Sequence, residues 1–326
     1  MYDNTIQSTN KNAVVAQGLG KRYGELWALR DVDLEVRTGS ILGLLGHNGA
    51  GKTSAIRILT TLALPSEGRA TVAGFDVVNQ SAQVRAQIGV AAQAATVDGL
   101  LTARANLEMI GWLYHLPRDM ARRRADELLE RVALTVAADR LVRTFSGGMR
   151  RRLDLAASLV ATPPVLFLDE PTTGLDPQSR NDLWELLREL VRDGATLVLT
   201  TQYLEEADRL ADNIVLLDHG RVAATGSPAE LKARIGGERI AVTVAGPEAL
   251  ESAAIALGPF ADGKPSLDRE SLQIVTAVRP GTRLMEVVRA LDAAGVDAVD
   301  AARRDATLDD VFLTLTNGSP ALEVAA

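Results

Sequence analysis

Three short strings, in a fixed order along the chain, constrain its fold more than any other feature. Residues 46–53 read GHNGAGKT, residues 145–149 read FSGGM, and residues 165–171 read VLFLDEP. The first string fits the pattern G-x-x-x-x-G-K-[ST], in which backbone N–H groups surround the phosphates of a nucleoside triphosphate. Such a loop follows a strand and opens a helix, so the sequence predicts an α/β fold with a strand at residues 41–45 and a helix that begins near Lys52.

The glycine-rich loop offers both a phosphate site and a metal ligand. Gly46, Gly49 and Gly51 let the backbone curl toward the phosphates without an obstructing Cβ, and the following helix adds positive potential. Lys52 brings a point charge to the phosphates. The Thr53 hydroxyl is a small, hard ligand suited to Mg²⁺.

Two adjacent carboxylates end the third string. Asp169 follows an apolar strand at residues 165–168, where it would hold Mg²⁺ directly or through water. Glu170 stands next to it, as a general base for an attacking water must. Alone, such a pair reads as a solvated strand end; beside a phosphate loop we interpret it as metal ligand and base.

The middle string gives the chain a second anion-binding helix terminus. Ser146, Gly147 and Gly148 open a helix predicted at residues 149–160. One nucleotide needs only one phosphate loop, so this second terminus is surplus unless it serves another molecule.

Taken together and in this order, the strings resemble the nucleotide-binding subunit of an ABC transporter, over about residues 14–226. The resemblance implies a P-loop NTPase core with an antiparallel β portion, a helical subdomain at about residues 98–160, and ATP and Mg²⁺ as cofactors. It also assigns ATP contacts to the remaining loop residues: His47, Asn48, Ala50 and Ser54.

Two further residues take roles from this resemblance. Gln93 follows a predicted strand at residues 88–92 and resembles the family's Q-loop glutamine, which contacts Mg²⁺ and the water; a lone Gln after a strand does not demand that role. Tyr23, in KRYG, resembles the aromatic residue that stacks on adenine, although a tyrosine in a turn is more often merely packed.

The resemblance also gives the surplus helix terminus a use. Two chains would pack head to tail as a homodimer, and Ser146, Gly147, Gly148 and Met149 of one chain would cap the γ-phosphate on the other. Asp176, in TGLDP, matches the D-loop that crosses this interface.

The chain departs from the family pattern at two positions. Met149 replaces the usual amide of the signature, so any contact made by that amide is lost. Gln202 stands where most members carry a switch histidine, and none of the three histidines, at 47, 115 and 219, fits that position. We assign Gln202 to the catalytic site and expect slower or partner-dependent hydrolysis, because an amide binds phosphate oxygens but transfers no proton at neutral pH.

The segments at residues 146–160, 200–212 and 308–316 are similar to the daunorubicin-resistance type of exporter ATPase. This implies an ATPase at the cytoplasmic face of the membrane that powers export of a drug or lipid-like compound through a separate permease. The arginine triplet at residues 150–152 has two readings: a solvated helix face with nearby acids, or a role near the nucleotide interface.

Composition narrows the function classes. The net charge of −7 and the lack of a dense basic tract argue against nucleic-acid binding. The chain has no cysteine, which excludes disulfides and thiolate metal sites. Its apolar stretches are far shorter than the roughly 20 residues that span a bilayer, so a transport path would belong to another chain.

We expect four segments along the chain. Residues 1–12 read as a disordered tail, 13–235 as the nucleotide-binding domain, 236–316 as a small C-terminal α/β domain of ferredoxin-like type, and 317–326 as a second tail. By analogy the C-terminal domain serves regulation or dimerisation.

Three alternatives stay open. A non-transport ABC protein would act on ribosomes or DNA, but such chains usually carry two cassettes, zinc modules or long coiled coils. An importer ATPase would carry a longer all-β tail. An ATP-dependent clamp with little turnover is compatible with Gln202.

Overall fold

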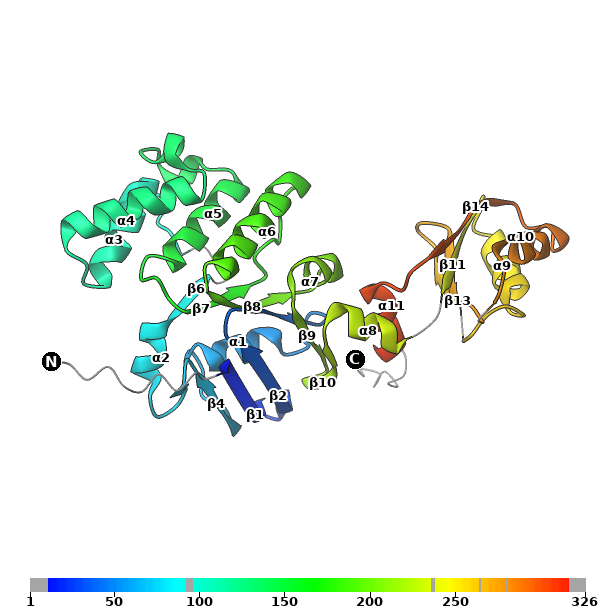
Figure 1. Cartoon of the computed structure of the whole chain (residues 1–326), viewed down its shortest axis with the longest axis horizontal. Coiled ribbons are helices and arrows are strands. Elements are labelled where there is room, and N and C mark those ends of the chain that lie inside the picture. The colour runs from blue at the N-terminus through cyan, green and yellow to red at the C-terminus, as the bar shows by residue number, and fades with distance from the viewer. Residues whose placement is uncertain (1–10, 92–95, 236–237, 264, 280, 317–326) are drawn as a thin grey trace. The chain divides into compact units, whose positions relative to one another are not determined.

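The computed structural model describes residues 11–91, 96–235, 238–263, 265–279 and 281–316 (Figure 1). The chain divides into two compact units, residues 1–228 and 229–326. The division falls a few residues before the expected boundary at 235, because most of α8 (Pro228–Arg234) belongs to the second unit. The expected N-terminal tail is also shorter, since Asn12 already begins β1 and pairs with Arg37. The expected C-terminal tail lies outside the described residues.

A six-stranded sheet forms the centre of the first unit, in the order β10-β9-β3-β8-β7-β6. All strands except β10 run parallel, and their Ile, Leu and Val side chains are buried on both faces, as in parallel sheets covered by helices. Loops at the carboxyl ends of neighbouring parallel strands therefore meet at one edge. The strands are β3 (Ile41–Leu45), β6 (Ile88–Ala91), β7 (Val165–Asp169), β8 (Thr196–Thr201), β9 (Asn213–Asp218) and β10 (Arg221–Gly226).

A second, antiparallel sheet of order β2-β1-β4-β5 lies beside α1 (Lys52–Leu59) and confirms the predicted β portion (Figure 1). Its apolar face and that of α1 share one core with the central sheet. Two of its strands, β4 and β5, and the helix α2 (Ser81–Gln87) were not predicted from the sequence. The strands are β1 (Asn12–Tyr23), β2 (Leu26–Arg37), β4 (Glu67–Val72) and β5 (Phe75–Asp76).

Helices inserted between β6 and β7 form the predicted helical subdomain (Figure 1). They pack on α6 through a core of leucine, alanine and valine side chains. The helices of this region are α3 (Ala103–Leu113), α4 (Arg118–Arg131), η1 (Thr135–Ala137), η2 (Val142–Thr144) and α5 (Gly147–Ser158), followed after β7 by α6 (Pro177–Arg192) and α7 (Leu204–Leu210).

Two surface ion pairs involve residues of α4. Glu127 and Arg131 have the i,i+4 spacing at which an ion pair can form within one helix. Instead, Glu127 lies 3.2 Å from Arg124, and Arg131 pairs with Asp193 just after α6. Exposed pairs of this kind each contribute little, at most about 1 kcal/mol, so a tertiary partner readily displaces the local one.

The second unit contains the expected ferredoxin-like arrangement. Its elements follow the order β-α-β-β-α-β, and its antiparallel sheet has the order β12-β13-β11-β14. Helices α9 and α10 pack on this sheet around a separate apolar core (Figure 1). Strand β12 was not predicted from the sequence, because its three residues are all exposed and so show no alternation of buried and exposed side chains. The elements are β11 (Arg239–Val244), α9 (Ala249–Leu257), β12 (Ser266–Asp268), β13 (Gln273–Ala277), α10 (Leu284–Ala293), β14 (Ala298–Arg304) and α11 (Leu308–Thr316).

Throughout the part of the chain that the structure describes, no helix combines the length and the apolar character needed to cross a membrane.

A candidate nucleotide-binding and hydrolysis site

The loop between β3 and α1 has a shape that requires glycine. A Cβ on Gly46 would lie 2.5 Å from the carbonyl oxygen of Leu217. Gly51 has a φ of +107°, and a Cβ there would lie 2.4 Å from the carbonyl oxygen of Ala28. Gly49 has a φ of +84°. The three glycines predicted to shape a phosphate loop are therefore needed for its conformation.

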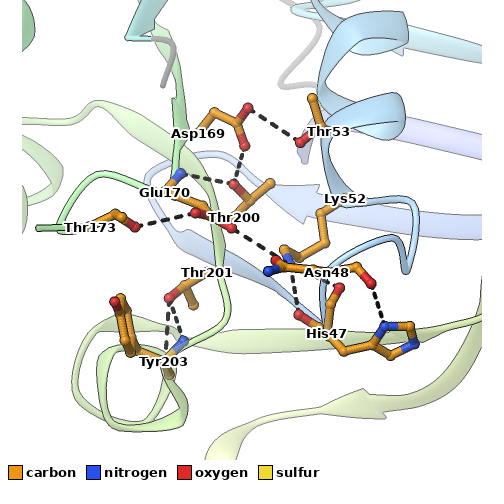
Figure 2. A network of polar contacts seen from close by, with 11 residues as sticks. His47, Asn48, Lys52, Thr53, Asp169, Glu170, Thr173, Thr200, Thr201 and Tyr203 are labelled. Atoms are coloured by element: carbon orange, nitrogen blue, oxygen red, sulfur yellow. Dashed lines mark hydrogen bonds and ion pairs between the residues drawn. The ribbon is translucent and has the colours of Figure 1, made fainter. Parts of the chain in front are cut away.

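Lys52 lies at the centre of this loop. Its Nζ donates hydrogen bonds to the carbonyl oxygens of Gly46 and His47, at 2.6 and 3.1 Å. The same nitrogen lies 3.8 Å from Glu170 Oε1 (Figure 2). Burial lowers the pKa of Lys52, and the charges of Glu170 and Asp169 oppose this shift. The ammonium group is thus held between the loop and the carboxylates, where a phosphate would replace its neutral carbonyl partners.

The oxygen atoms around Asp169 fit a magnesium ion. Asp169 Oδ2 accepts a hydrogen bond from Thr53 Oγ1 at 3.4 Å, and Oδ1 accepts one from Thr200 Oγ1 at 2.5 Å (Figure 2). A hydroxyl and a carboxylate facing each other are the hard oxygen donors that Mg²⁺ prefers. Gln93, the other predicted metal contact, lies outside the described residues.

Glu170 adopts a left-handed backbone conformation, with a φ of +48°. Its N–H donates to Thr200 Oγ1 at 3.0 Å, and its Oε2 accepts from Thr173 Oγ1 at 3.2 Å (Figure 2). This conformation costs a non-glycine residue about 1–3 kcal/mol and persists only where the surroundings enforce it. The Glu170 carboxylate lies toward Lys52, with 3.8 Å between Oε1 and Nζ, and its role as a general base stays a prediction.

Arg151, on α5, binds the backbone of the turn that carries Glu170. Its Nε donates to the carbonyl oxygen of Pro171 at 2.7 Å. Its Nη2 donates to those of Asp169 and Glu170, both at 2.9 Å. Burial lowers the pKa of Arg151, yet a guanidinium stays charged in proteins. The middle arginine of the triplet therefore connects the helix of the FSGGM string to the turn that carries Glu170.

The FSGGM string begins α5 as predicted. Ser146 Oγ accepts a hydrogen bond from the N–H of Met149 at 3.2 Å and caps the helix. Ser146 and Gly147 are exposed, whereas Gly148 is buried, and a Cβ there would lie 2.7 Å from Ser179 Oγ. Met149 packs against the apolar core. This packing accounts for an apolar residue where the family has an amide.

Asp176 caps α6. Its Oδ1 accepts from the N–H of Ser179 at 2.9 Å and its Oδ2 accepts from Ser179 Oγ at 2.7 Å. These hydrogen bonds lower the pKa of Asp176. The residue thus has a role within one chain, and its predicted place at a dimer interface stays a prediction.

The remaining predicted residues lie around the same loop or at strand ends. Tyr23, at the end of β1, is 47% exposed, with the Lys21 ammonium 5.0 Å from its ring centroid. Gln202 is half-buried directly after β8. In the loop and α1, Asn48 is exposed, Ala50 is buried and Ser54 is half-buried, and the contacts expected of them with ATP stay predictions.

Sequence reasoning missed Thr200. This residue lies one position before the end of β8 and is the register partner of Asp169 in the parallel pairing of β7 and β8. Its hydroxyl donates to Asp169 and accepts from the N–H of Glu170, so it sets the positions of both acids. The available signal was a Thr at the end of an apolar strand, but its partner depends on a register that the sequence does not state.

The helix that follows Gln202, α7, contains a buried acidic residue. Glu206 is fully buried in α7 and accepts a hydrogen bond from Trp184 Nε1 at 3.0 Å. Burial raises the pKa of Glu206, although hydrogen bonds from Thr201, Trp184 and Thr172 oppose the shift. The folded protein therefore keeps a proton on Glu206 at pH values where the unfolded chain has lost it.

Replacement of Glu206 by Gln is expected to remove this pH dependence. In the wild type, the bound proton contributes to the free energy of unfolding. This contribution is fully present below the ordinary pKa of glutamate and is lost as the pH rises through the pKa of Glu206 in the folded protein. It amounts to about 1.4 kcal/mol for each unit by which the two pKa values differ. The amide stays neutral and its oxygen can still accept from Trp184. The free energy of unfolding of Glu206→Gln should therefore rise relative to the wild type between pH 4 and 8. Curves of unfolding free energy against pH that run parallel for the wild type and Glu206→Gln would contradict this. So would the same change in the exposed control Glu205→Gln.

Comparisons with known proteins agree with this geometry. Residues 29–173 match the family model described as ABC transporter. A daunorubicin resistance ATP-binding protein of Streptomyces coeruleorubidus is 53% identical over 93% of this chain and 95% of that relative. A doxorubicin resistance ATP-binding protein of Mycobacterium tuberculosis is 45% identical, with 93% of each chain covered.

A solved structure shares the fold of the first unit. It is a dimeric ATP-binding cassette in a post-hydrolysis state, bound to ADP and Pi, with a TM-score of 0.60 and 27% identity; the match covers 66% of this chain and 98% of that one. The glycine-rich loop, the two carboxylates and the FSGGM string thus occur here in the fold of an ATP-binding cassette. The chain belongs to the ATP-binding subunits of ABC transporters, ATPases with a P-loop, and within them to the daunorubicin-resistance type.

Proposed function

We propose that this chain hydrolyses ATP to power export of a drug or lipid-like hydrophobic compound through a separate membrane permease. The observation that carries the proposal is the convergence of Lys52, Asp169 and Glu170 on the glycine-rich loop. The relatives named for resistance to daunorubicin and doxorubicin support a drug as cargo.

Each residue of the site has a task in this reaction. The loop N–H groups and Lys52 would bind the phosphates, and Thr53 and Asp169 would hold Mg²⁺, which neutralises charge on the phosphate oxygens. Glu170 accepts the proton of the water as its oxygen bonds to the γ-phosphorus. The bond from that phosphorus to the bridging oxygen breaks, which gives ADP and phosphate. Arg151 keeps the Glu170 backbone in the conformation that this proton transfer needs.

A homodimer would complete the site. Ser146 and Gly147 lie exposed at the start of α5, and helix N-termini of this kind favour a phosphate. In a head-to-tail pair, this terminus of one chain would contact the γ-phosphate on the other. The dimeric state of the similar cassette structure supports this arrangement. The dimer would lie at the cytoplasmic face of the membrane, against its permease.

Co-purification from mildly solubilised membranes tests this function. A tagged Glu170→Gln chain with ATP would hold the dimer closed while its partners are identified. We expect a stoichiometric, multi-spanning permease, in a complex whose wild-type form shows ATPase activity stimulated by cargo. Ribosomes, nucleic acid or no partner would contradict the exporter function.

Gln202 favours a second candidate, an ATP-dependent clamp with low turnover. The residue directly follows β8, at the sheet edge that carries the site, and its amide transfers no proton. We expect Gln202→His to raise kcat severalfold and Gln202→Ala to lower it, with the KM for ATP little changed in Gln202→His. Steady-state phosphate release measures both. Equal turnover in the wild type and Gln202→His would make the substitution neutral and would remove the argument for a clamp.

A further inference from the structure

Two of the chain's three histidines lie together beside the glycine-rich loop. His47 Nε2 lies 3.2 Å from Asp218 Oδ1, and His219 Nε2 lies 3.8 Å from the same oxygen. The two rings stand edge to face, with 5.3 Å between their centroids. One ligand atom from each of these three residues lies within 4.8 Å of the other two. Three groups able to bind a metal thus converge at one point.

The hydrogen bonding of His47 identifies which nitrogen faces this point. Its Nδ1 lies 2.6 Å from the carbonyl oxygen of Asn48. A carbonyl oxygen only accepts, so Nδ1 carries a hydrogen and Nε2 faces Asp218. A neutral ring would then direct a lone pair at a carboxylate oxygen, which requires a cation between them: a proton or a metal ion. An Nδ1–H donated to a backbone carbonyl is also the arrangement that orients histidines bound to metals through Nε2.

The distances suit a first-row transition metal. With metal–ligand bonds of about 2.0–2.2 Å and tetrahedral angles, neighbouring ligand atoms lie about 3.4 Å apart. The two separations from Asp218 Oδ1, 3.2 and 3.8 Å, lie on either side of this value. The side chain of Asp218 is only 14% exposed, whereas that of His219 is 77% exposed in the turn between β9 and β10. The His219 ring therefore has the freedom to close the longer separation.

The cluster is separate from the catalytic magnesium ligands. Figure 2 shows the His47 ring on the outer side of the loop, directed away from Thr53 and Asp169. Two imidazoles and one carboxylate favour Zn²⁺ and similar ions, whereas Mg²⁺ prefers the all-oxygen set. We propose that His47, Asp218 and His219 form a site for one divalent transition-metal ion such as Zn²⁺. A bound ion would join the glycine-rich loop to the turn after β9.

Metal titration of the nucleotide-free full chain, purified without a polyhistidine tag, tests this site. Co²⁺ serves as the spectroscopic probe, and competition by Zn²⁺ gives the affinity for the colourless ion. We expect one tight equivalent and visible absorption bands of low-coordinate Co²⁺. His219→Gln and Asp218→Asn should each weaken binding at least about tenfold, the scale found even for residues that merely orient metal ligands. The chain offers a matched control in His115→Gln, which should bind as the wild type does.

Two outcomes would overturn the proposal. Binding that survives His219→Gln unchanged would place the ion elsewhere, such as at the catalytic carboxylates. An equal loss in His115→Gln would show binding to histidines at large. Far-ultraviolet circular dichroism, and ATPase activity measured with Mg²⁺ and no added transition metal, should be unchanged in His219→Gln, which separates loss of the site from loss of the fold.

Discussion

Replacement of Glu170 by Gln is expected to abolish ATP turnover while ATP binding persists. The amide has the shape of the carboxylate and can still accept from Thr173, so the turn should keep its conformation. It cannot take the proton of the attacking water, and loss of a general base typically lowers kcat by about 10²–10⁴-fold. ATP affinity should be equal or higher, because a negative charge near the γ-phosphate is removed. Phosphate release and titration with a fluorescent ATP analogue measure the two effects.

An exposed glutamate supplies the control for this variant. Glu185→Gln makes the same chemical change on the surface of α6 and should leave both parameters unchanged. Hydrolysis retained in Glu170→Gln would remove the base role from Glu170. A joint loss of turnover and ATP binding would instead show that Glu170 mainly holds Lys52 in place.

The second large effect is expected from Arg151→Met, which keeps an unbranched side chain that can pack as the arginine stem does but removes the three hydrogen bonds to the turn that carries Glu170. The hydrogen bonds from α5 that support the left-handed backbone conformation of Glu170 would then be lost. A displacement of about 1 Å at a reacting group can lower the rate about 100-fold, so we expect kcat to fall by about 10–100-fold. The KM for ATP should stay within about twofold, because these hydrogen bonds go to the backbone of the turn at residues 169–171 and not to the phosphate-binding loop.

Neighbouring and conservative variants distinguish this positioning role from a loss of folding. Arg152 donates a long hydrogen bond to the carbonyl oxygen of Val132, at 3.5 Å, and among the described residues it makes none to the turn that carries Glu170, so Arg152→Met should leave kcat near the wild-type value. Arg151→Lys should restore part of the rate, since an ammonium group can satisfy some of the same carbonyls. An unchanged kcat in Arg151→Met, or a KM that rises as kcat falls, would contradict the role.

Much of the first unit could be predicted because its local chemistry is restrictive. Only glycine accommodates the backbone around Gly46 and Gly51, and a phosphate loop needs a strand before it and a helix after it. The apolar strands of the central sheet follow as short runs of Ile, Leu and Val between turns. The βαββαβ order of the second unit was likewise readable from alternating patterns, apart from the exposed strand β12.

The residues that support the site could not be predicted, because their partners are distant in sequence. Thr200 meets Asp169 only through the register of two parallel strands. Arg151 is one of three consecutive arginines, and only the tertiary packing of α5, which contacts β6, selects it to bind the turn that carries Glu170. Arg131 pairs across helices with Asp193 rather than with its helical neighbour Glu127. Local spacing carries no information about such contacts.

In the proposed homodimer, Glu170 of one chain acts with the signature of a second copy. A test of this arrangement needs a signature variant that folds. Gly147 is exposed, a Cβ there would meet nothing within 4 Å, and an acid is tolerated at the start of a helix. Gly147→Asp should therefore keep α5 intact while its charge repels the partner's γ-phosphate.

The most direct measurement is the ATPase activity of mixed dimers. Glu170→Gln and Gly147→Asp chains, each inactive alone, would be co-expressed with different tags and purified through both tags in turn. In a head-to-tail pair, one of the two sites combines an intact Glu170 with an intact Gly147, so the mixed dimer should hydrolyse ATP. Mixed dimers as inactive as either parent would contradict a site completed by a second copy.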